Sequence, residues 1–181
     1  MKRVQPIREK SKIEDIKKIL KGQNDRNFIM FCMGIYTGLR ISDILQLKVG
    51  DLKNKEYIRI FEQKTGKENR ILINPSLKRE LKKFIEFRND DEYLIKSREG
   101  KNKPLKRDMA YKILSAAAKE IGLEEIGTHT LRKTFGYHFY LKTKDIGLLM
   151  DMFNHSAPNI TLRYIGINQD KRDKALRAFR Y

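Results

Sequence analysis

The chain has 181 residues, the size of one ordinary domain, and 40% of them are hydrophobic, which is enough to bury a core and excludes a disordered basic tail. Lysine and arginine number 40 against 23 aspartates and glutamates, and the resulting charge of +17 predicts a polyanionic partner, most often nucleic acid. A membrane span is excluded because no apolar stretch approaches roughly 18 residues, and no signal-peptide pattern follows Met1.

The distribution of charge indicates which polyanion the chain binds, and the cysteine content indicates its cellular compartment. Binding to an anionic membrane surface is the alternative, but it usually shows as one amphipathic basic helix, whereas here the basic residues are spread along the whole chain. The single cysteine, Cys32, cannot form an internal disulfide and excludes zinc sites built on several thiolates. We therefore expect a cytoplasmic protein.

The first part of the chain is predicted to be helical after a basic lead-in at residues 1–12. Ser11 and the glutamate three residues later have the spacing of a capping box, which predicts a helix that starts at Ser11. A loop is expected over residues 22–27, and a second helix then runs to Gly38, because a glycine can end a helix. Ser42 is predicted to cap a third, short helix.

The middle of the chain contains the predicted β-structure. Residues 57–61 and 70–73 are rich in β-formers and flank a polar stretch with a glycine, residues 62–69, which predicts a hairpin with a basic tip or edge. Pro75 opens another helix, and residues 93–95 are predicted to form a short strand.

The last part of the chain is predicted to be helical in pieces. Helices are expected over residues 106–121, 130–141 and 144–153, followed by a turn over 158–164 and a helical tail over 169–179. The sequence contains no repeat, low-complexity tract or long linker. These patterns together predict a mostly α domain with a small antiparallel β-sheet, an α+β fold.

An arginine, Arg40, lies in the tight turn expected between the second and third helices. Its planar fork of donors suits a phosphate, and a rigid corner would fix its direction. The other interpretation is a structural pair between Arg40 and Asp43, which is favoured for this segment taken alone.

His129 and Arg132 lie three residues apart at the predicted start of a helix. On a helix they share one face, and the helix start presents free backbone N–H groups and a partial positive charge that favour an anion. A solvated basic helix end explains the same residues equally well.

A histidine and a tyrosine flank the predicted turn near the end of the chain. His155 and Tyr164 lie nine residues apart. A tyrosine has an ordinary pKa of about 10, so as a nucleophile it needs cationic neighbours or a base to help it ionise. The alternative is a half-buried aromatic side chain. His138 lies in a predicted helix among aromatic residues and needs no functional role.

Neither a metal nor a nucleotide cofactor is expected. The three histidines form no H-x-x-x-H arrangement, and no acidic pair lies beside them. No glycine-rich phosphate loop with the G-x-x-x-x-G-K-[ST] spacing occurs, and residues 64–67 are too short for that motif. Phosphate chemistry in this chain therefore has to rely on arginine, lysine and histidine.

Taken in order, these segments resemble the tyrosine recombinase (integrase) family over residues 11–167. The resemblance is carried by four boxes, which are Thr37-Gly38-Leu39-Arg40-Ile41-Ser42-Asp43, Gln63-Lys64-Thr65-Gly66, His129-Thr130-Leu131-Arg132 and the pair His155 and Tyr164. The sequences of residues 133–136 and 161–166 resemble those of integrases of phages and mobile elements in low-GC Gram-positive bacteria. The family commonly has glycine where Asn154 precedes the histidine, a departure that we expect to change the local turn and not the chemistry.

The resemblance implies a reaction on a DNA phosphodiester that needs no metal and no ATP. Tyr164 would attack the phosphorus and give a 3′-phosphotyrosine and a free 5′-hydroxyl. Arg40 and Arg132 would stabilise the charge that develops on the phosphate oxygens, and His155 would assist as a donor.

The resemblance assigns three further residues to the same site. His129 would be the acid–base partner near the tyrosine. Lys64, on the hairpin, would protonate the leaving 5′-oxygen. Asp43 would support the site by pairing with a neighbouring basic residue.

The resemblance also implies an organisation of the chain and its partners. Residues 13–167 correspond to the catalytic domain, and residues 168–181 form a tail that docks on a neighbouring subunit of a tetrameric synapse, with packing on its own domain as the alternative. The expected partner is double-stranded DNA of the bacterial nucleoid. Family members usually carry an N-terminal core-binding domain, so this chain is expected to be an excised fragment or a minimal stand-alone protein with weak, mostly electrostatic DNA binding.

Two other functions remain open at this point. The first is a non-catalytic DNA-binding regulator with the recombinase fold. The missing core-binding domain favours this function, whereas the presence of a residue at every catalytic position of the family opposes it. The second is a type IB topoisomerase-like enzyme that relaxes DNA by the same chemistry without synapsis.

Overall fold

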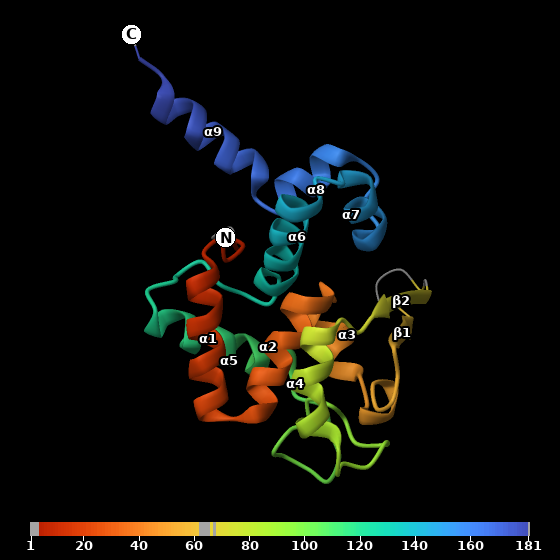
Figure 1. Ribbon diagram of the computed structural model, residues 1–181. Coiled ribbons are helices and arrows are strands. Elements are labelled where there is room, and N and C mark those ends of the chain that lie inside the picture. Colours follow the sequence, from red (N-terminus) through yellow and green to blue (C-terminus); the bar gives the residue numbers. More distant parts are fainter. Residues whose placement is uncertain (1–3, 62–65, 67, 181) are drawn as a thin grey trace.

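The fold consists of two helical bodies, one stacked on the other, with a small hairpin on the side of the first (Figure 1). The computed structural model describes residues 4–61, 66 and 68–180. The helices are α1 (Lys10–Gln23), α2 (Asp25–Thr37), α3 (Ile41–Gln46), α4 (Pro75–Ile85), α5 (Arg107–Glu120), α6 (Thr130–Thr143), α7 (Ile146–Phe153), α8 (Pro158–Tyr164) and α9 (Ile167–Ala178), with a 3₁₀ turn η1 at Val49–Asp51. The strands are β1 (Tyr57–Phe61) and β2 (Glu68–Leu72). The predicted mostly α fold with a small antiparallel sheet is confirmed.

The first two helices nearly touch, and the predicted loop over residues 22–27 is wrong. Asn24 alone separates α1 from α2, and its side chain accepts a hydrogen bond of 2.8 Å from the Arg26 backbone N–H. This bond satisfies one free N–H at the start of α2. The expected start at Ser11 is also wrong, because α1 begins one residue earlier with Glu9 at its N-cap.

The turn between α2 and α3 is fixed by Gly38. This glycine ends α2 in the left-handed conformation, with φ of 67°, which confirms the predicted stop. A β-carbon there would lie 2.4 Å from Cδ1 of Phe135 in α6, so the turn packs tightly against the second body. The N-cap of α3 is Arg40, and Ser42 lies inside the helix rather than at its cap.

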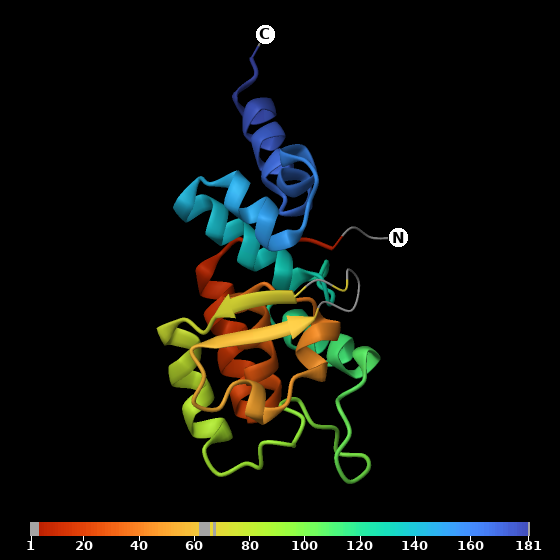
Figure 2. The ribbon, with the colours of Figure 1, turned by 90° about the vertical axis from the view of Figure 1, so that its right-hand side faces the viewer.

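The predicted hairpin is present, and its strands pair antiparallel with Arg59 opposite Arg70. Ile58 and Ile60 are buried, whereas Arg59 and Phe61 on the other face are exposed. Figure 2 shows the two strands lying across the face of the first body. The second strand begins at Glu68, two residues earlier than predicted.

The strand predicted over residues 93–95 is wrong. Within the described residues this segment forms an isolated bridge between Lys48 and Tyr93, and the Leu94 N–H donates to the Leu47 carbonyl at 2.8 Å. Leu94 and Ile95 are nevertheless buried. Their apolar character therefore reflects the core and not a sheet.

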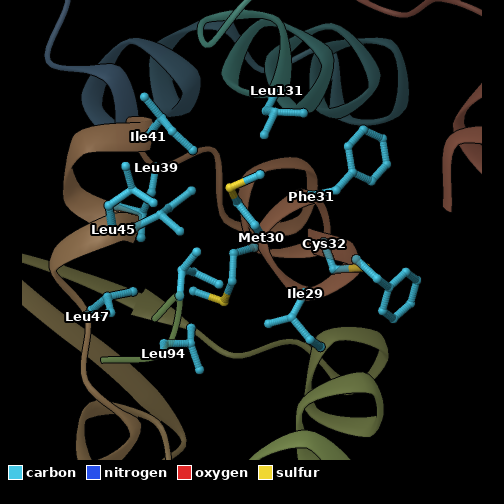
Figure 3. Close-up of a cluster of buried hydrophobic side chains, with 14 of the residues drawn as sticks. Ile29, Met30, Phe31, Cys32, Leu39, Ile41, Leu45, Leu47, Leu94 and Leu131 are labelled. Carbon is cyan, nitrogen blue, oxygen red and sulfur yellow. The ribbon is translucent and has the colours of Figure 1, made fainter. Parts of the chain in front are cut away.

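The core of the first body is built around α2 (Figure 3). Met30 of α2 faces the leucines and isoleucines that follow it, whereas Phe31 points to the other side of the helix. Leu131 of α6 closes the core from the second body. A β-carbon on Gly34 would lie 2.4 Å from Cδ1 of Leu131. The glycine therefore lets α6 approach α2 closely, which brings Arg132, the next residue of α6, against the end of α2.

A smaller apolar cluster holds the second body together. It consists of Tyr137, Leu149, Phe153, Ile165 and Ile167, and it joins α6, α7, α8 and the start of α9. The segment predicted as a turn over residues 158–164 is the helix α8, which begins with a proline at its N-terminus.

The last helix, α9, extends away from both bodies (Figures 1 and 2). It begins at Ile167, two residues before the predicted tail, and Ile167 is its buried residue among those described. Leu176 and Phe179 are 72% and 61% exposed. None of the helices that the structure describes has the length and hydropathy needed to cross a membrane.

Candidate active site

Arg132 lies at the junction of the two bodies and is 4% exposed. Its Nη1 donates to the Gly38 carbonyl at 2.7 Å and its Nη2 donates to the Phe153 carbonyl at 3.2 Å. The guanidinium also lies over the Phe153 ring, 4.1 Å from the centroid. Backbone carbonyls therefore hold a buried charge in one orientation between the end of α2 and the end of α7.

Tyr164, the last residue of α8, lies beside this arginine. The phenol accepts a hydrogen bond from Arg132, and its ring meets the His155 ring edge-on with centroids 5.3 Å apart. Burial raises the pKa of Tyr164, while the positive charges of Arg132 and Arg40 and the Arg132 hydrogen bond oppose that rise in part. The phenol is therefore protonated at neutral pH and needs a base if it is to act as a nucleophile.

His155 is oriented by a residue that the sequence analysis did not single out. Its Nδ1 is hydrogen-bonded to Oγ1 of Thr161 at 2.9 Å, and Thr161 is fully buried in α8. Asn154 adopts the left-handed conformation, with φ of 53°, at the end of α7. The turn and the threonine together aim the imidazole at Tyr164.

His129 occupies the N-cap of α6 and is surrounded by cations. Burial lowers the pKa of its imidazole, and the charges of Arg107, Lys133, Arg132 and Arg40 lower it further. The imidazole is consequently neutral at pH 7 and is able to accept a proton. Arg107, at the start of α5, was not among the predicted site residues.

Arg40 and Asp43 are brought to the same junction by α3. Arg40 is half-buried, and its charge acts on both Tyr164 and His129. Asp43 is 5% exposed, its backbone N–H donates to the Arg40 carbonyl at 3.0 Å, and its carboxylate accepts a hydrogen bond of 3.4 Å from Ser42. The pairing of the Asp43 carboxylate with a basic residue remains a prediction.

Lys64 lies outside the described residues. The strands β1 and β2 on either side of it are described, and Arg70 and Leu72 of β2 line a cavity of about 590 Å³. The same cavity is lined by Arg132 and Asn154. The hairpin therefore borders the site that contains the buried arginine.

A second lysine, Lys133, was missed by the sequence analysis. Its Nζ lies 5.1 Å from the centroid of the Tyr164 ring, next to Arg132 in the chain. His138, for which no role was expected, is hydrogen-bonded through Nε2 to the Ile7 carbonyl at 2.9 Å. Among the described residues, no three histidine, cysteine, aspartate or glutamate side chains are grouped so that they could hold a metal ion.

The fold around this site is that of a tyrosine recombinase catalytic domain. The chain is similar to the lambda integrase in a structure titled as a tetramer bound to a Holliday junction, with a TM-score of 0.70 and 18% identity over 89% of this chain and 48% of that chain.

The chain belongs to the phage integrase family, whose model matches residues 9–171. It is 51% identical to the probable integrase/recombinase YoeC of Bacillus subtilis (strain 168), over 97% of each chain. It is also 28% identical to the tyrosine recombinase XerA of Pyrococcus furiosus, over 83% of this chain and 54% of that one. It thus spans 97% of the length of one relative and about half the length of the other.

Proposed function

We propose that the chain is a site-specific DNA recombinase that cleaves and rejoins DNA through a 3′-phosphotyrosine, without a metal ion or ATP. The observation that carries this proposal is the position of the Tyr164 phenol, which is hydrogen-bonded to Arg132 and packed on His155 of its own chain. Family membership and the net charge of +17 support it, because a basic chain attracts the phosphate backbone.

The first step is attack by the Tyr164 oxygen on a phosphorus atom of DNA. A bond forms between the phenolic oxygen and phosphorus, and the bond from phosphorus to the 5′-oxygen breaks. Negative charge develops on the non-bridging oxygens, where Arg40, Arg132 and His155 stabilise it by donating hydrogen bonds. Removing one such donor typically costs on the order of 10²–10³ in rate.

Two proton transfers accompany this displacement. The phenol proton passes to His129, whose neutral imidazole is available as a base. The leaving 5′-oxygen takes a proton from Lys64, since an ammonium gives up a proton more readily than a guanidinium. The phosphotyrosine conserves the phosphodiester energy, so a 5′-hydroxyl of a partner strand reseals the DNA without ATP.

The proposed partners are double-stranded DNA and further copies of this chain. The lambda integrase to which the chain is similar is described as a tetramer on a Holliday junction. Helix α9 extends from its own domain and exposes Leu176 and Phe179. We propose that this end of α9 docks on a neighbouring copy.

Trapping of the covalent intermediate tests the proposal. With a suicide substrate, whose cleaved fragment diffuses away, the wild-type chain should accumulate a covalent DNA adduct in the presence of EDTA. Tyr164→Phe should form no adduct and bind the same DNA nearly as well, because the change removes one hydroxyl.

Three outcomes separate the alternatives. An adduct with Tyr164→Phe would disprove the assignment of the nucleophile. DNA binding with neither adduct nor relaxation would show a regulator, and relaxation of supercoils without strand exchange would show a topoisomerase-like enzyme.

A further inference from the structure

The segment that precedes α1 lies against the second body. Residues 4–8, which we call the N-terminal strap, run without helical or strand structure, and Pro6 and Ile7 within it are buried. Residues 4–8 consequently lie at the junction of the two bodies, close to α6 (Figure 1). The strap is therefore packed structure and not a free end.

Three hydrogen bonds fasten the strap to α6. Lys133 Nζ donates to the Val4 carbonyl at 2.7 Å, and the Ile7 N–H donates to Oγ1 of Thr134 at 2.9 Å within the buried interior. The Ile7 carbonyl is bonded to Nε2 of His138, also at 2.9 Å. Both ends of the strap are thus held by side chains of one helix.

The strap is also fastened to the turn that follows the nucleophile. Arg8 Nε lies 2.7 Å from Oδ1 of Asp170 in α9. Gly166, two residues after Tyr164, has φ of 88°, and a β-carbon there would lie 3.2 Å from Cγ of Pro6 and 3.0 Å from Nη2 of Arg8. The strap and the Tyr164 turn are therefore in close contact.

Lys133 connects these two sets of contacts. The ammonium that holds the Val4 carbonyl also lies over the Tyr164 ring, 5.1 Å from its centroid. A cation over an aromatic face is attracted by the ring quadrupole, and the attraction grows as water is excluded. One side chain is thus bonded to the strap and packed on the nucleophile.

We propose that Lys133 is a positioning residue, which couples the N-terminal strap to Tyr164 and holds the phenol at the approach that cleavage requires. This role rests on the proposed function, since it concerns the same nucleophile. A displacement of about 1 Å in a reacting group can cost roughly a hundredfold in rate. Loss of the coupling should accordingly slow cleavage without a matching loss of DNA binding.

The test compares Lys133→Met, Lys133→Arg and the matched control Lys142→Met, which removes an exposed lysine from the same helix. The measured quantities are the single-turnover rate of adduct formation at saturating suicide substrate, the DNA dissociation constant and the melting temperature. We expect Lys133→Met to lose about tenfold to a hundredfold in rate, with a dissociation constant close to that of Lys142→Met. Lys133→Arg, which keeps a charged donor, should restore most of the rate.

A double-mutant cycle with Arg8→Ala tests the coupling to the strap. If Lys133 acts through the strap, the rate losses of Arg8→Ala and Lys133→Met are not additive. Three outcomes would each overturn the proposal. These are additive losses, a Lys133→Met rate equal to that of Lys142→Met, and a loss that appears only at subsaturating DNA and is matched by a higher dissociation constant. Arg8→Ala changes a half-exposed ion pair, so it reports on the strap even if Lys133→Met fails to fold.

The wild-type and Tyr164→Phe chains keep the two proposals distinguishable. A wild-type chain that forms no adduct refutes the proposed function, and positioning of the nucleophile falls with it. If the wild-type chain forms adduct and the cleavage rate of Lys133→Met equals that of Lys142→Met, only the positioning role is refuted.

Discussion

A buried guanidinium serves two purposes in this site. Arg132 holds the end of α2 to the end of α7 through two carbonyls, and it also donates to the Tyr164 phenol. An unpaired charge at this depth would be costly, so the carbonyls that satisfy it also fix its direction. The residue that organises the junction is therefore also the residue that contacts the proposed nucleophile, Tyr164.

The contact between His155 and Thr161 gives a prediction at the residue scale. Thr161→Val removes the hydroxyl bonded to Nδ1 and keeps the shape of the side chain. We expect the single-turnover cleavage rate to fall roughly fivefold to tenfold, the equivalent of one net hydrogen bond of about 1 kcal/mol. Thr161→Ser keeps the hydroxyl and should stay near the wild-type rate. If Thr161→Val and Thr161→Ser lower the cleavage rate equally, the loss comes from altered packing and not from the missing hydroxyl.

The environment of His129 gives a prediction about pH. Burial lowers the pKa of the His129 imidazole from the ordinary 6.5, and the surrounding cations lower it further. The imidazole therefore remains mostly neutral at pH 6.5. The cleavage rate should therefore remain on its plateau as the pH falls through 6.5 and decline only at lower pH. His129→Asn should remove this acid limb and lower the plateau. A wild-type midpoint at or above 6.5 would contradict the assignment of the base.

The sequence could predict the individual boxes but not every neighbour of the nucleophile. Arg40, Arg132 and His155 all lie near Tyr164, and their catalytic roles remain predictions. Thr161 was missed because its contact with His155 requires α8 to be a helix, and the proline at the start of that helix was the available signal. Lys133 lay in a segment that carried the resemblance, but no role was assigned to it. Arg107 carried no signal, since it is one of many basic residues.

At the scale of elements, the close approach of α6 to α2 depends on one glycine. Gly34 has Leu131 packed directly on it, and Arg132 follows in the chain. The bend at Gly38 then brings Arg40 toward the same place. The two glycines, Gly34 and Gly38, therefore determine where Arg132 and Arg40 lie relative to each other.

Gly34→Ala is expected to destabilise the chain and to slow cleavage. The added methyl would lie 2.4 Å from Leu131, and overpacking of this kind costs typically about 1–3 kcal/mol. Gly22→Ala is the matched control, because its β-carbon meets nothing within 4 Å and alanine favours the helix by roughly 0.5–1 kcal/mol. Chemical denaturation measures both changes. A Gly34→Ala chain as stable as Gly22→Ala would contradict the packing described.

The N-cap residues were harder to predict from the sequence than the presence of the helices. Ser11 and Ser42 both lie inside the helices they were expected to cap, whereas Asn24 and Asn74 act as N-caps through their side chains. Serine is tolerated in a first turn as well as at a cap, so the packing of the helix decides between the two positions. The other helical segments followed from their apolar spacing, whereas α8 was predicted as a turn.

At the scale of the whole molecule, most of α9 is exposed beyond its first residues. Its contacts with the rest of the chain are concentrated at its start, where Ile167 is buried and Asp170 pairs with Arg8. The far end exposes Leu176 and Phe179. The tail predicted from the sequence is present as a helix, and its docking on a second copy remains a prediction.

Leu176→Asp combined with Phe179→Asp tests this docking. We expect the double variant to bind one DNA half-site within about threefold of wild type, since each added carboxylate weakens phosphate binding only modestly. It should fail to form multimers on DNA in sedimentation experiments, because acidic side chains oppose burial. Phe87→Asp, at a position 93% exposed on the first body, is the control. Multimers of unchanged stability would show that α9 does not dock.

The reach of Tyr164 to Arg132 within one polypeptide has a consequence for mixed assemblies. If the proposed function is correct, each copy cleaves with its own phenol and its own guanidinium. A copy with Tyr164→Phe should then leave uncut only the strand that it binds. The yield of severed strands should then decline in direct proportion to the share of inactive copies. Mixing Tyr164→Phe chains with Arg132→Ala chains should restore no cleavage, because neither variant could supply its missing side chain to the site of the other.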